Sequence, residues 1–245
     1  MAVRGEFRVG TSGWQYDDWK GVFYPEGLPK KDWFNHYAKH FDTVEVNNTF
    51  YNLPSSETFD SWHDQAPPGF RYALKFSRYG TQMKKLKDPE GPLETFMERA
   101  DRLKSFLGPI LVQLPPHWKR NVQRLDGFLR AAPRHVRWAV EFRDEIWLHD
   151  EVYDVLRAHG AALVIHDLIK DHPEVITADW VYMRFHGVDY SHNYSSQELT
   201  GAAGRIRSHL DAGLDVYAYF NNDYHGHAVN NALDLRRYVE PESGT

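Results

Sequence analysis

Glu45 and Glu141 have the clearest capacity for chemistry in this sequence, because each carboxylate lies within a short apolar run. Two carboxylates with different neighbours can act as general acid and general base, or as nucleophile and acid. Two other interpretations stay open for the pair: either glutamate could ligate a metal ion or neutralise a buried cation. The candidate cations are Lys75, Arg143 and Arg184.

A histidine and an aspartate extend the set of candidate catalytic residues. His186 ends an apolar run and precedes Gly187, and its ring nitrogens can donate, accept or bind metal near neutral pH. A structural histidine is the alternative, since the chain contains 14 histidines. Asp167 follows another run and stands beside His166, a weaker candidate.

The cations and side-chain amides suit the binding of a polar substrate. Lys75, Arg143 and Arg184 could orient a phosphate or carboxylate group. Ser12, Asn47, Gln113 and Asn221 could donate hydrogen bonds to the substrate or to developing charge. Trp14 opens an aromatic stretch that extends to Tyr24, for which packing is the first interpretation and stacking on a sugar or base the second.

The elements that must position these residues alternate along the chain between strand-like and helix-like patterns. Strands alternating with helices predict parallel pairing, and eight such units favour a single (β/α)8 TIM-type barrel domain over residues 1–245. The predicted strands lie near 6–12, 41–47, 70–76, 109–114, 136–142, 161–167, 180–186 and 215–221. The predicted helices lie near 31–40, 56–65, 92–106, 122–131, 149–159, 196–211 and 226–238.

Local signals support the helix starts and the strand register. Hydroxyls at Ser55 and Ser195 are expected to cap helices, and Pro92 is expected to open one. In a barrel, alternate strand residues point inward and toward the helices. This alternation turns Tyr72 and Phe76 toward the helices and places the polar candidates inside, at the carboxyl ends of strands, where barrel enzymes carry their catalytic groups.

Composition excludes several classes of protein. The chain of 245 residues has no cysteine, which removes disulfides, thiolate nucleophiles and cysteine-held metals. No apolar leader or stretch of about 18 apolar residues is present, so we expect a cytoplasmic protein with no membrane partner. The sequence lacks a GxGxxG signature for NAD or flavin, and no specific cofactor is indicated. It also lacks a compact HExxH metal motif, so a divalent metal would have to be held by residues from separate strands.

Charge is unevenly distributed within a chain of net charge -5. Residues 78–87 carry four cations and no acid, and residues 117–124 carry Lys119, Arg120 and Arg124 without an acid. Solvated loops or helix faces are the first interpretation of such runs. Contacts with nucleic-acid phosphates are the alternative.

Six short motifs resemble one family in the same order along the whole chain. They are GTSGW at 10–14, VEVNNTFY at 44–51, QLPP at 113–116, ExR at 141–143, RFHG at 184–187 and FNN at 220–222. They resemble the YecE-like family, domain of unknown function 72. The resemblance implies a TIM-type barrel and leaves the reaction unassigned. Thr81 is followed here by Gln82, where family members often have histidine, which weakens the metal hypothesis.

Three functions follow from these patterns. The leading hypothesis is an enzyme, hydrolase- or isomerase-like, that acts on a polar, anionic substrate such as a phosphosugar or nucleotide-like molecule. The second is nucleic-acid binding or processing through the basic segments, which would make affinity fall steeply with salt. The third is a non-catalytic ligand-binding barrel that would tolerate amides at Glu45 and Glu141. None of the patterns specifies an oligomeric state.

Overall fold

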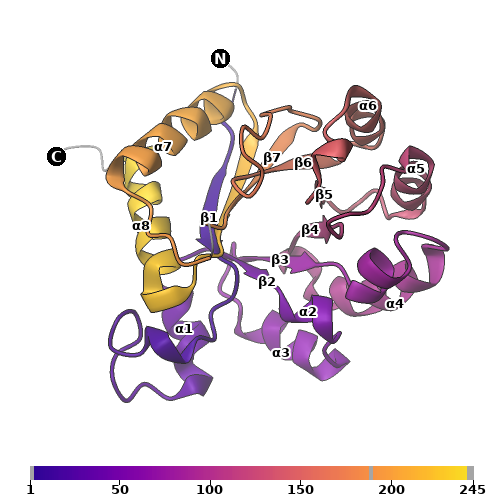
Figure 1. The fold of residues 1–245 in the computed structure, drawn as a ribbon. Coiled ribbons are helices and arrows are strands. Elements are labelled where there is room, and N and C mark those ends of the chain that lie inside the picture. The colour runs from indigo at the N-terminus through magenta and orange to yellow at the C-terminus, as the bar shows by residue number, and fades with distance from the viewer. Residues whose placement is uncertain (1–2, 188–189, 242–245) are drawn as a thin grey trace. The chain divides into compact units, whose positions relative to one another are not determined.

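The computed structural model describes residues 3–187 and 190–241 and contains eight strands that alternate with helices (Figure 1). The sheet order is β1-β8-β7-β6-β5-β4-β3-β2, so the first strand pairs with the last. This order defines a (β/α)8 barrel and confirms the predicted fold class. The strands are β1 (Phe7–Thr11), β2 (Thr43–Val46), β3 (Arg71–Lys75), β4 (Leu107–Gln113), β5 (Trp138–Glu141), β6 (Ala162–His166), β7 (Trp180–Phe185) and β8 (Asp215–Phe220).

The helices between the strands match the seven predicted segments and add a short one. The α-helices are α1 (Trp33–Tyr37), α2 (Asn48–Tyr51), α3 (Ser56–Gln65), α4 (Glu90–Ala100), α5 (Val122–Ala131), α6 (Asp150–His159), α7 (Ser196–Asp211) and α8 (His227–Val239). Single turns are η1 (Asp17–Trp19), η2 (Lys30–Asp32), η5 (Glu145–Trp147) and η6 (Tyr224–Gly226), with a longer 3-10 stretch, η4 (Asp101–Phe106), and a π-helical turn, η3 (Tyr79–Met83). Among the described residues, no helix has the length and apolarity to cross a membrane.

The chain divides into two compact units. Unit 1 comprises residues 1–44, 166–168 and 180–245, and unit 2 comprises residues 45–165 and 169–179. Each unit contains parallel strands, so within each unit the carboxyl ends of paired strands lie at one edge.

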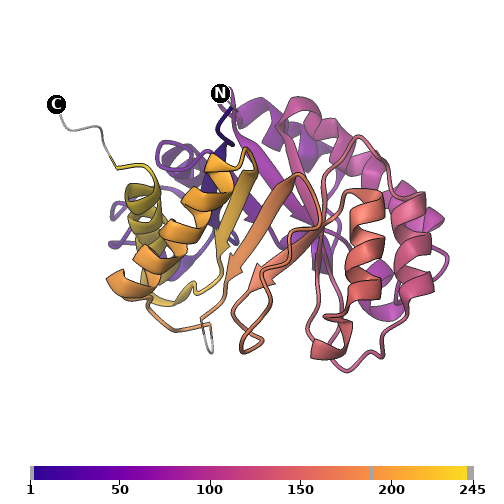
Figure 2. The ribbon, with the colours of Figure 1, turned by 90° about the horizontal axis from the view of Figure 1, so that it is seen from above.

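Unit 1 is built on β1, β8 and β7, with α7 and α8 side by side along them (Figures 1 and 2). The aromatic loop after β1 packs into this unit. Tyr24 stacks on Trp33 with ring centroids 4.6 Å apart, and both side chains are almost completely buried, as is Trp19. The packing interpretation of this loop therefore describes most of its aromatic residues.

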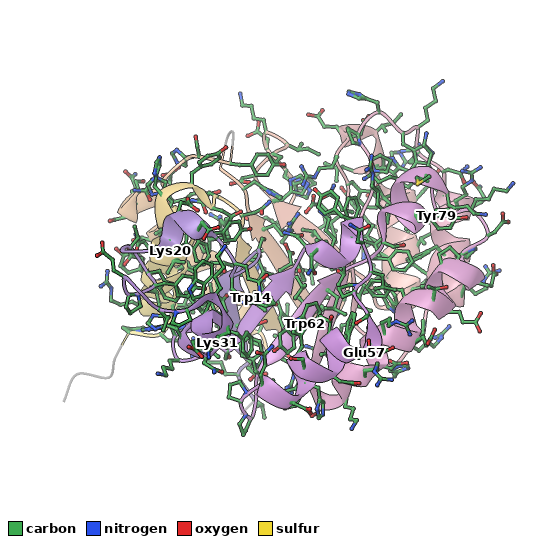
Figure 3. The ribbon with its side chains drawn as sticks, turned by 90° about the horizontal axis from the view of Figure 1, so that it is seen from below. Trp14, Lys20, Lys31, Glu57, Trp62 and Tyr79 are labelled. Atoms are coloured by element: carbon green, nitrogen blue, oxygen red, sulfur yellow. The ribbon has the colours of Figure 1, made fainter. Side chains whose placement is uncertain are left out.

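Unit 2 carries the helix-facing side chains expected from the strand register. Phe76, one residue beyond β3, contacts Phe96 of α4 and Phe128 of α5 with ring centroids 5.0 and 5.4 Å apart. The Tyr72 hydroxyl donates to the carbonyl of Trp62 on α3 at 2.9 Å; Figure 3 labels Trp62. Figures 1 and 2 both show α5 and α6 side by side.

Two of the predicted helix starts need correction. Ser195 forms the expected capping box with Glu198, but the Ser55 side chain makes no cap bond to its helix and its hydroxyl instead lies 3.3 Å from that of Thr58. Pro92 is the third residue of α4, which begins at Glu90. Proline is tolerated there because the first-turn amides need no intrahelical acceptor.

Candidate functional site

The polar candidates of unit 2 lie at the carboxyl ends of its strands. Lys75, Gln113 and Glu141 are the last residues of β3, β4 and β5, and Gln113 is paired in register with Glu141. Glu45 lies on β2, completely buried, and Asn47 follows that strand, half-buried. Because β3, β4 and β5 run parallel, their terminal side chains share one edge of the unit.

Arg143 connects two of these residues. Its Nε donates to Glu141, and its Nη2 donates to the Gln113 side-chain oxygen at 3.1 Å. The Glu141 side chain is completely buried, whereas that of Arg143 is 15% exposed. A carboxylate removed from water is stabilised by such a charge-assisted hydrogen bond. The predicted neutralisation of Glu141 by a cation is therefore present in this ion pair.

Lys75 lies beside the short helix α2, which the sequence analysis did not predict. Its Nζ lies 4.5 Å from the centroid of the Phe50 ring, and the residue is 7% exposed. The Thr49 hydroxyl donates to the Lys75 carbonyl at 2.8 Å and to the Val46 carbonyl at 3.0 Å. These bonds join α2 to the ends of β2 and β3 and hold an aromatic face against the ammonium group.

In unit 1, His186 lies between Arg184 and Asn221. Its Nε2 is 3.4 Å from Nη1 of Arg184, and its Nδ1 is 3.2 Å from the amide of Asn221. A guanidinium can only donate, so Nε2 is the acceptor in this contact. Arg184 and His186 are both buried.

Asp167 holds the turn that follows β7. Its carboxylate accepts hydrogen bonds from the backbone amides of His186 at 2.9 Å and Gly187 at 3.2 Å, and from the Tyr194 hydroxyl. Burial, followed by the charge of Asp167, raises the pKa of Tyr194, so the phenol stays protonated and donates. Gly187 has a φ of 67°, and a Cβ there would lie 2.8 Å from that of His192. The turn therefore requires glycine.

Tyr194 and Asn222 are two residues of this region that the sequence analysis missed. The Asn222 amide donates to the His192 carbonyl at 2.7 Å and to the Asn231 side chain at 2.9 Å. Asn222 belongs to the FNN motif, which could have marked it. No pattern marks Tyr194, because its partner Asp167 lies 27 positions away.

Ser12 and Trp14 lie close to the end of β1, and both are buried. The Ser12 amide donates to the Phe220 carbonyl at 2.8 Å, and its carbonyl accepts from Tyr16 at 2.6 Å. Trp14 packs edge-on against Phe34, with centroids 5.6 Å apart. Both residues thus contribute to the packing of the loop after β1.

The two units bring together different subsets of the predicted residues. Unit 1 gathers Asp167, Arg184, His186 and Asn221; unit 2 gathers Gln113, Glu141 and Arg143, with Lys75 beside α2. Within the described part of the chain, no three histidine, aspartate or glutamate side chains form a group that could hold a metal ion. Gln82 lies on η3 and is half-buried.

The strand order and the polar residues at the strand ends define a (β/α)8-barrel protein of the TIM type. The chain belongs to the family described as "Protein of unknown function DUF72", which it matches over residues 8–245. This confirms the family resemblance of the sequence motifs.

Known relatives agree with this membership. The chain is 24% identical to UPF0759 protein YunF of Bacillus subtilis, over 96% of this chain and 95% of that protein. It is 28% identical to UPF0759 protein YecE of Escherichia coli K12, over 55% of this chain and 47% of that protein. A DUF72 family protein of Thermotoga maritima with a crystal structure is 31% identical, with a TM-score of 0.85 over 96% of this chain and 99% of that chain.

Proposed function

We propose that this protein is an enzyme that cleaves or isomerises a small, polar, anionic substrate, such as a phosphosugar, at the carboxyl ends of the barrel strands. The observation that carries the proposal is the burial of ionisable groups at those ends: Arg184 is 1% exposed, Lys75 is 7% exposed and Glu141 is completely buried. Burying an ion costs several kcal/mol before any partner compensates it. Natural proteins retain such groups where they serve a site, and barrel enzymes place their sites at this face.

The cations are assigned to substrate binding. Lys75 in unit 2 and Arg184 in unit 1 are each assigned to attract an anionic group, since buried ammonium and guanidinium groups attract phosphate or carboxylate strongly. Arg143 is already engaged by Glu141 and Gln113 and would orient those two side chains. The other residues assigned to substrate contacts are Asn47 in unit 2 and Ser12, Trp14 and Asn221 in unit 1.

The carboxylates are assigned to proton transfer. Glu45 and Glu141 would share the acid and base steps, which positioned carboxylates perform with gains of about 10²- to 10⁴-fold in rate. His186 would accept a proton from the substrate on its imidazole ring and return it later from the imidazolium form, which a histidine can do near neutral pH. Asp167 is assigned as a positioning residue, because backbone amides and Tyr194 occupy its carboxylate.

Calorimetric titration with phosphorylated and unphosphorylated forms of the same pentoses and hexoses tests the substrate class. We expect the phosphorylated sugars alone to bind, and Lys75→Gln to weaken that binding. Proton NMR of the same mixtures would then follow cleavage or isomerisation.

Glu45→Gln and Glu141→Gln separate catalysis from binding. Both variants should bind the phosphorylated sugar while turnover falls at least about 100-fold. Glu94→Gln, an exposed glutamate on α4, is the matched control and should leave both quantities unchanged. Equal turnover in all three variants would contradict the assignment, and binding without turnover in the wild type would favour a non-catalytic barrel.

A further inference from the structure

A pocket of about 720 Å³ opens in unit 2 between α2, η3 and the start of α4. Its lining includes Phe50, Tyr51, Tyr79, Lys84 and Asp88. The volume lies within the range of small-molecule sites, about 300 to 1,000 Å³. Neither Glu141 nor Arg143 lines this pocket, although Phe50 also contacts Lys75.

Exposed aromatic side chains surround the pocket. Tyr51 is 66% exposed and Tyr79 is 51% exposed, and Met83, on the same turn as Tyr79, is 71% exposed. In unit 2, all of whose residues the structure describes, Ile146 is the only other large apolar side chain with comparable exposure. Tyrosine faces on a pocket rim are suited to stacking on a planar ring. Figure 3 labels Tyr79 on η3.

Packing contacts hold the backbone of residues 79–88, the segment that carries Tyr79 and the exposed lysines. Gly80 approaches the Phe76 ring so closely that a Cβ would lie 2.5 Å from it, which fixes η3 against the core. Leu86 is 3% exposed and anchors the following loop, where Lys85, Leu86 and Asp88 have φ values of 50°, 60° and 44°. Lys85 and Lys87, on either side of the anchor, are exposed.

Positive charge lies outside the pocket and negative charge within it. Within residues 3–187 and 190–241, no carboxylate forms an ion pair with Arg78, Lys85 or Lys87, and all three are exposed. The second basic segment joins them, because Nη1 of Arg124 donates to the Lys85 carbonyl at 3.4 Å. Inside the pocket, Lys84 is paired with Asp88 at 3.3 Å.

Glu90 also lines the pocket, so its charged groups sum to about -1 when Lys84, Asp88 and Glu90 are counted. An isolated phosphate would be repelled from this interior but attracted to the surrounding cations. A nucleobase fits the interior better, because carboxylates accept hydrogen bonds from the exocyclic amino groups of cytosine and adenine.

We infer that unit 2 binds single-stranded nucleic acid, with one base in this pocket and the flanking phosphates on Arg78, Lys85, Lys87 and Arg124. The inference does not depend on the chemistry proposed for the strand ends. A duplex keeps its bases stacked and paired, so a single strand should bind in preference to a duplex. Amino-bearing bases should bind in preference to thymine.

Fluorescence anisotropy with a labelled oligo(dC) of about 12 nucleotides tests the inference. Tyr51→Ala and Tyr79→Ala should each weaken binding about 5- to 150-fold, the range expected for loss of one stacked base. Tyr224→Ala removes an exposed tyrosine of unit 1 and is the matched control, with unchanged affinity expected. Thr95→Trp, at an exposed α4 position that lines the pocket, should block binding while thermal melting stays normal.

The salt dependence tests the phosphate contacts separately. Between about 50 and 200 mM salt, each lost contact with a single strand should reduce the log–log slope by about 0.7, so Lys85→Gln with Lys87→Gln should reduce it by about 1.4. Lys31→Gln with Lys39→Gln removes two exposed lysines of unit 1 and should leave the slope unchanged.

Several results would overturn the inference. The inference fails if oligo(dC) does not bind at about 50 mM salt, or if a duplex of the same length binds with equal affinity. It also fails if Tyr51→Ala and Tyr224→Ala weaken binding equally. Competition by cytidine monophosphate as effective as that by the oligonucleotide would assign the pocket to a free nucleotide and contradict binding of a strand. Tighter binding of oligo(dT) than oligo(dC) would contradict the role of the pocket carboxylates.

Discussion

Replacing Glu141 by glutamine probes the central ion pair of unit 2. Glutamine keeps an oxygen that can accept from Nε of Arg143, but the bond loses one charge. The guanidinium stays charged, so the bond falls from the upper toward the lower end of the range of about 1.5 to 3 kcal/mol for hydrogen bonds with a charged group, an expected loss of about 1 to 2 kcal/mol. Glu141→Leu removes the acceptor completely, and breaking a buried pair costs about 3 to 5 kcal/mol.

Thermal and urea unfolding of both variants measure this difference. For a chain of 245 residues, 1 kcal/mol corresponds to about 2 to 4 °C in Tm, so glutamine should lower Tm by about 2 to 8 °C and leucine by about 6 to 20 °C. Arg143→Lys is the informative companion. Lysine keeps the positive charge, but it lacks the planar group that reaches both Glu141 and Gln113.

A double-mutant cycle decides whether the pair itself is responsible. Glu141→Leu combined with Arg143→Met should be more stable than the sum of the single effects predicts, because neither charge is then left without its partner. A coupling energy below about 0.5 kcal/mol would refute the reasoning. If Glu141→Gln melts at the wild-type temperature yet loses turnover, the glutamate serves catalysis and not stability.

Three further predictions concern residues 194–198 of unit 1, with Ser55 of unit 2 as a control. Ser195→Ala should destabilise by about 1 kcal/mol in urea unfolding, whereas Ser55→Ala, which removes no cap bond, should change stability by less than about 0.5. Hydrogen bonds from the Ser195 amide and hydroxyl lower the pKa of the Glu198 carboxyl group. The carboxylate therefore stabilises the fold above a pH of about 4.3, and this contribution is lost as the pH falls. The difference in stability between the wild type and Glu198→Gln should shrink in acid, and a constant difference would contradict this. Tyr194→Phe should cost about 1 kcal/mol through the lost bond to Asp167, and hydrogen exchange of the Gly187 amide should accelerate; unchanged exchange would contradict the positioning role.

The apolar runs and the alternation of side chains within them were sufficient to predict the strands and their register. All eight strands lie within two residues of their predicted limits, because a strand buried on both faces produces a compact apolar run bounded by polar residues. The helix-facing positions of Tyr72 and Phe76 follow from the same alternation.

Elements without a repeating pattern were not predictable. α2 spans four residues and η3 five, too few for a helical period to show, and both are held by contacts with β3 and its flanks, such as the Thr49 bond to Lys75. Ser55 has the residue type of a cap but lacks the geometry, which depends on how the chain enters the helix.

The candidate site was predictable to the extent that it depends on strand register. Gln113 and Glu141 were expected inside the barrel at strand ends, and Arg143 joins them as a neighbour two positions on. The role of Asp167 was not predictable, because its partners come from the β7 turn and from Tyr194, and only the folded loop brings them together. The exposed aromatic rim around Tyr79 depends likewise on the path of a loop.

The pairing of β1 with β8 has a consequence for synthesis on the ribosome. Glu6 donates its amide to the side chain of Asp215, a separation of 209 residues, so β1 must wait for nearly the whole chain before its pairing can form. Most of unit 2 is one continuous segment, which can begin to fold while unit 1 is incomplete. We therefore expect the first strand to be exposed to chaperones for most of translation. Pulse-labelling hydrogen exchange during refolding should show amides of β4 and β5 protected before those of β1; the reverse order would contradict this sequence of events.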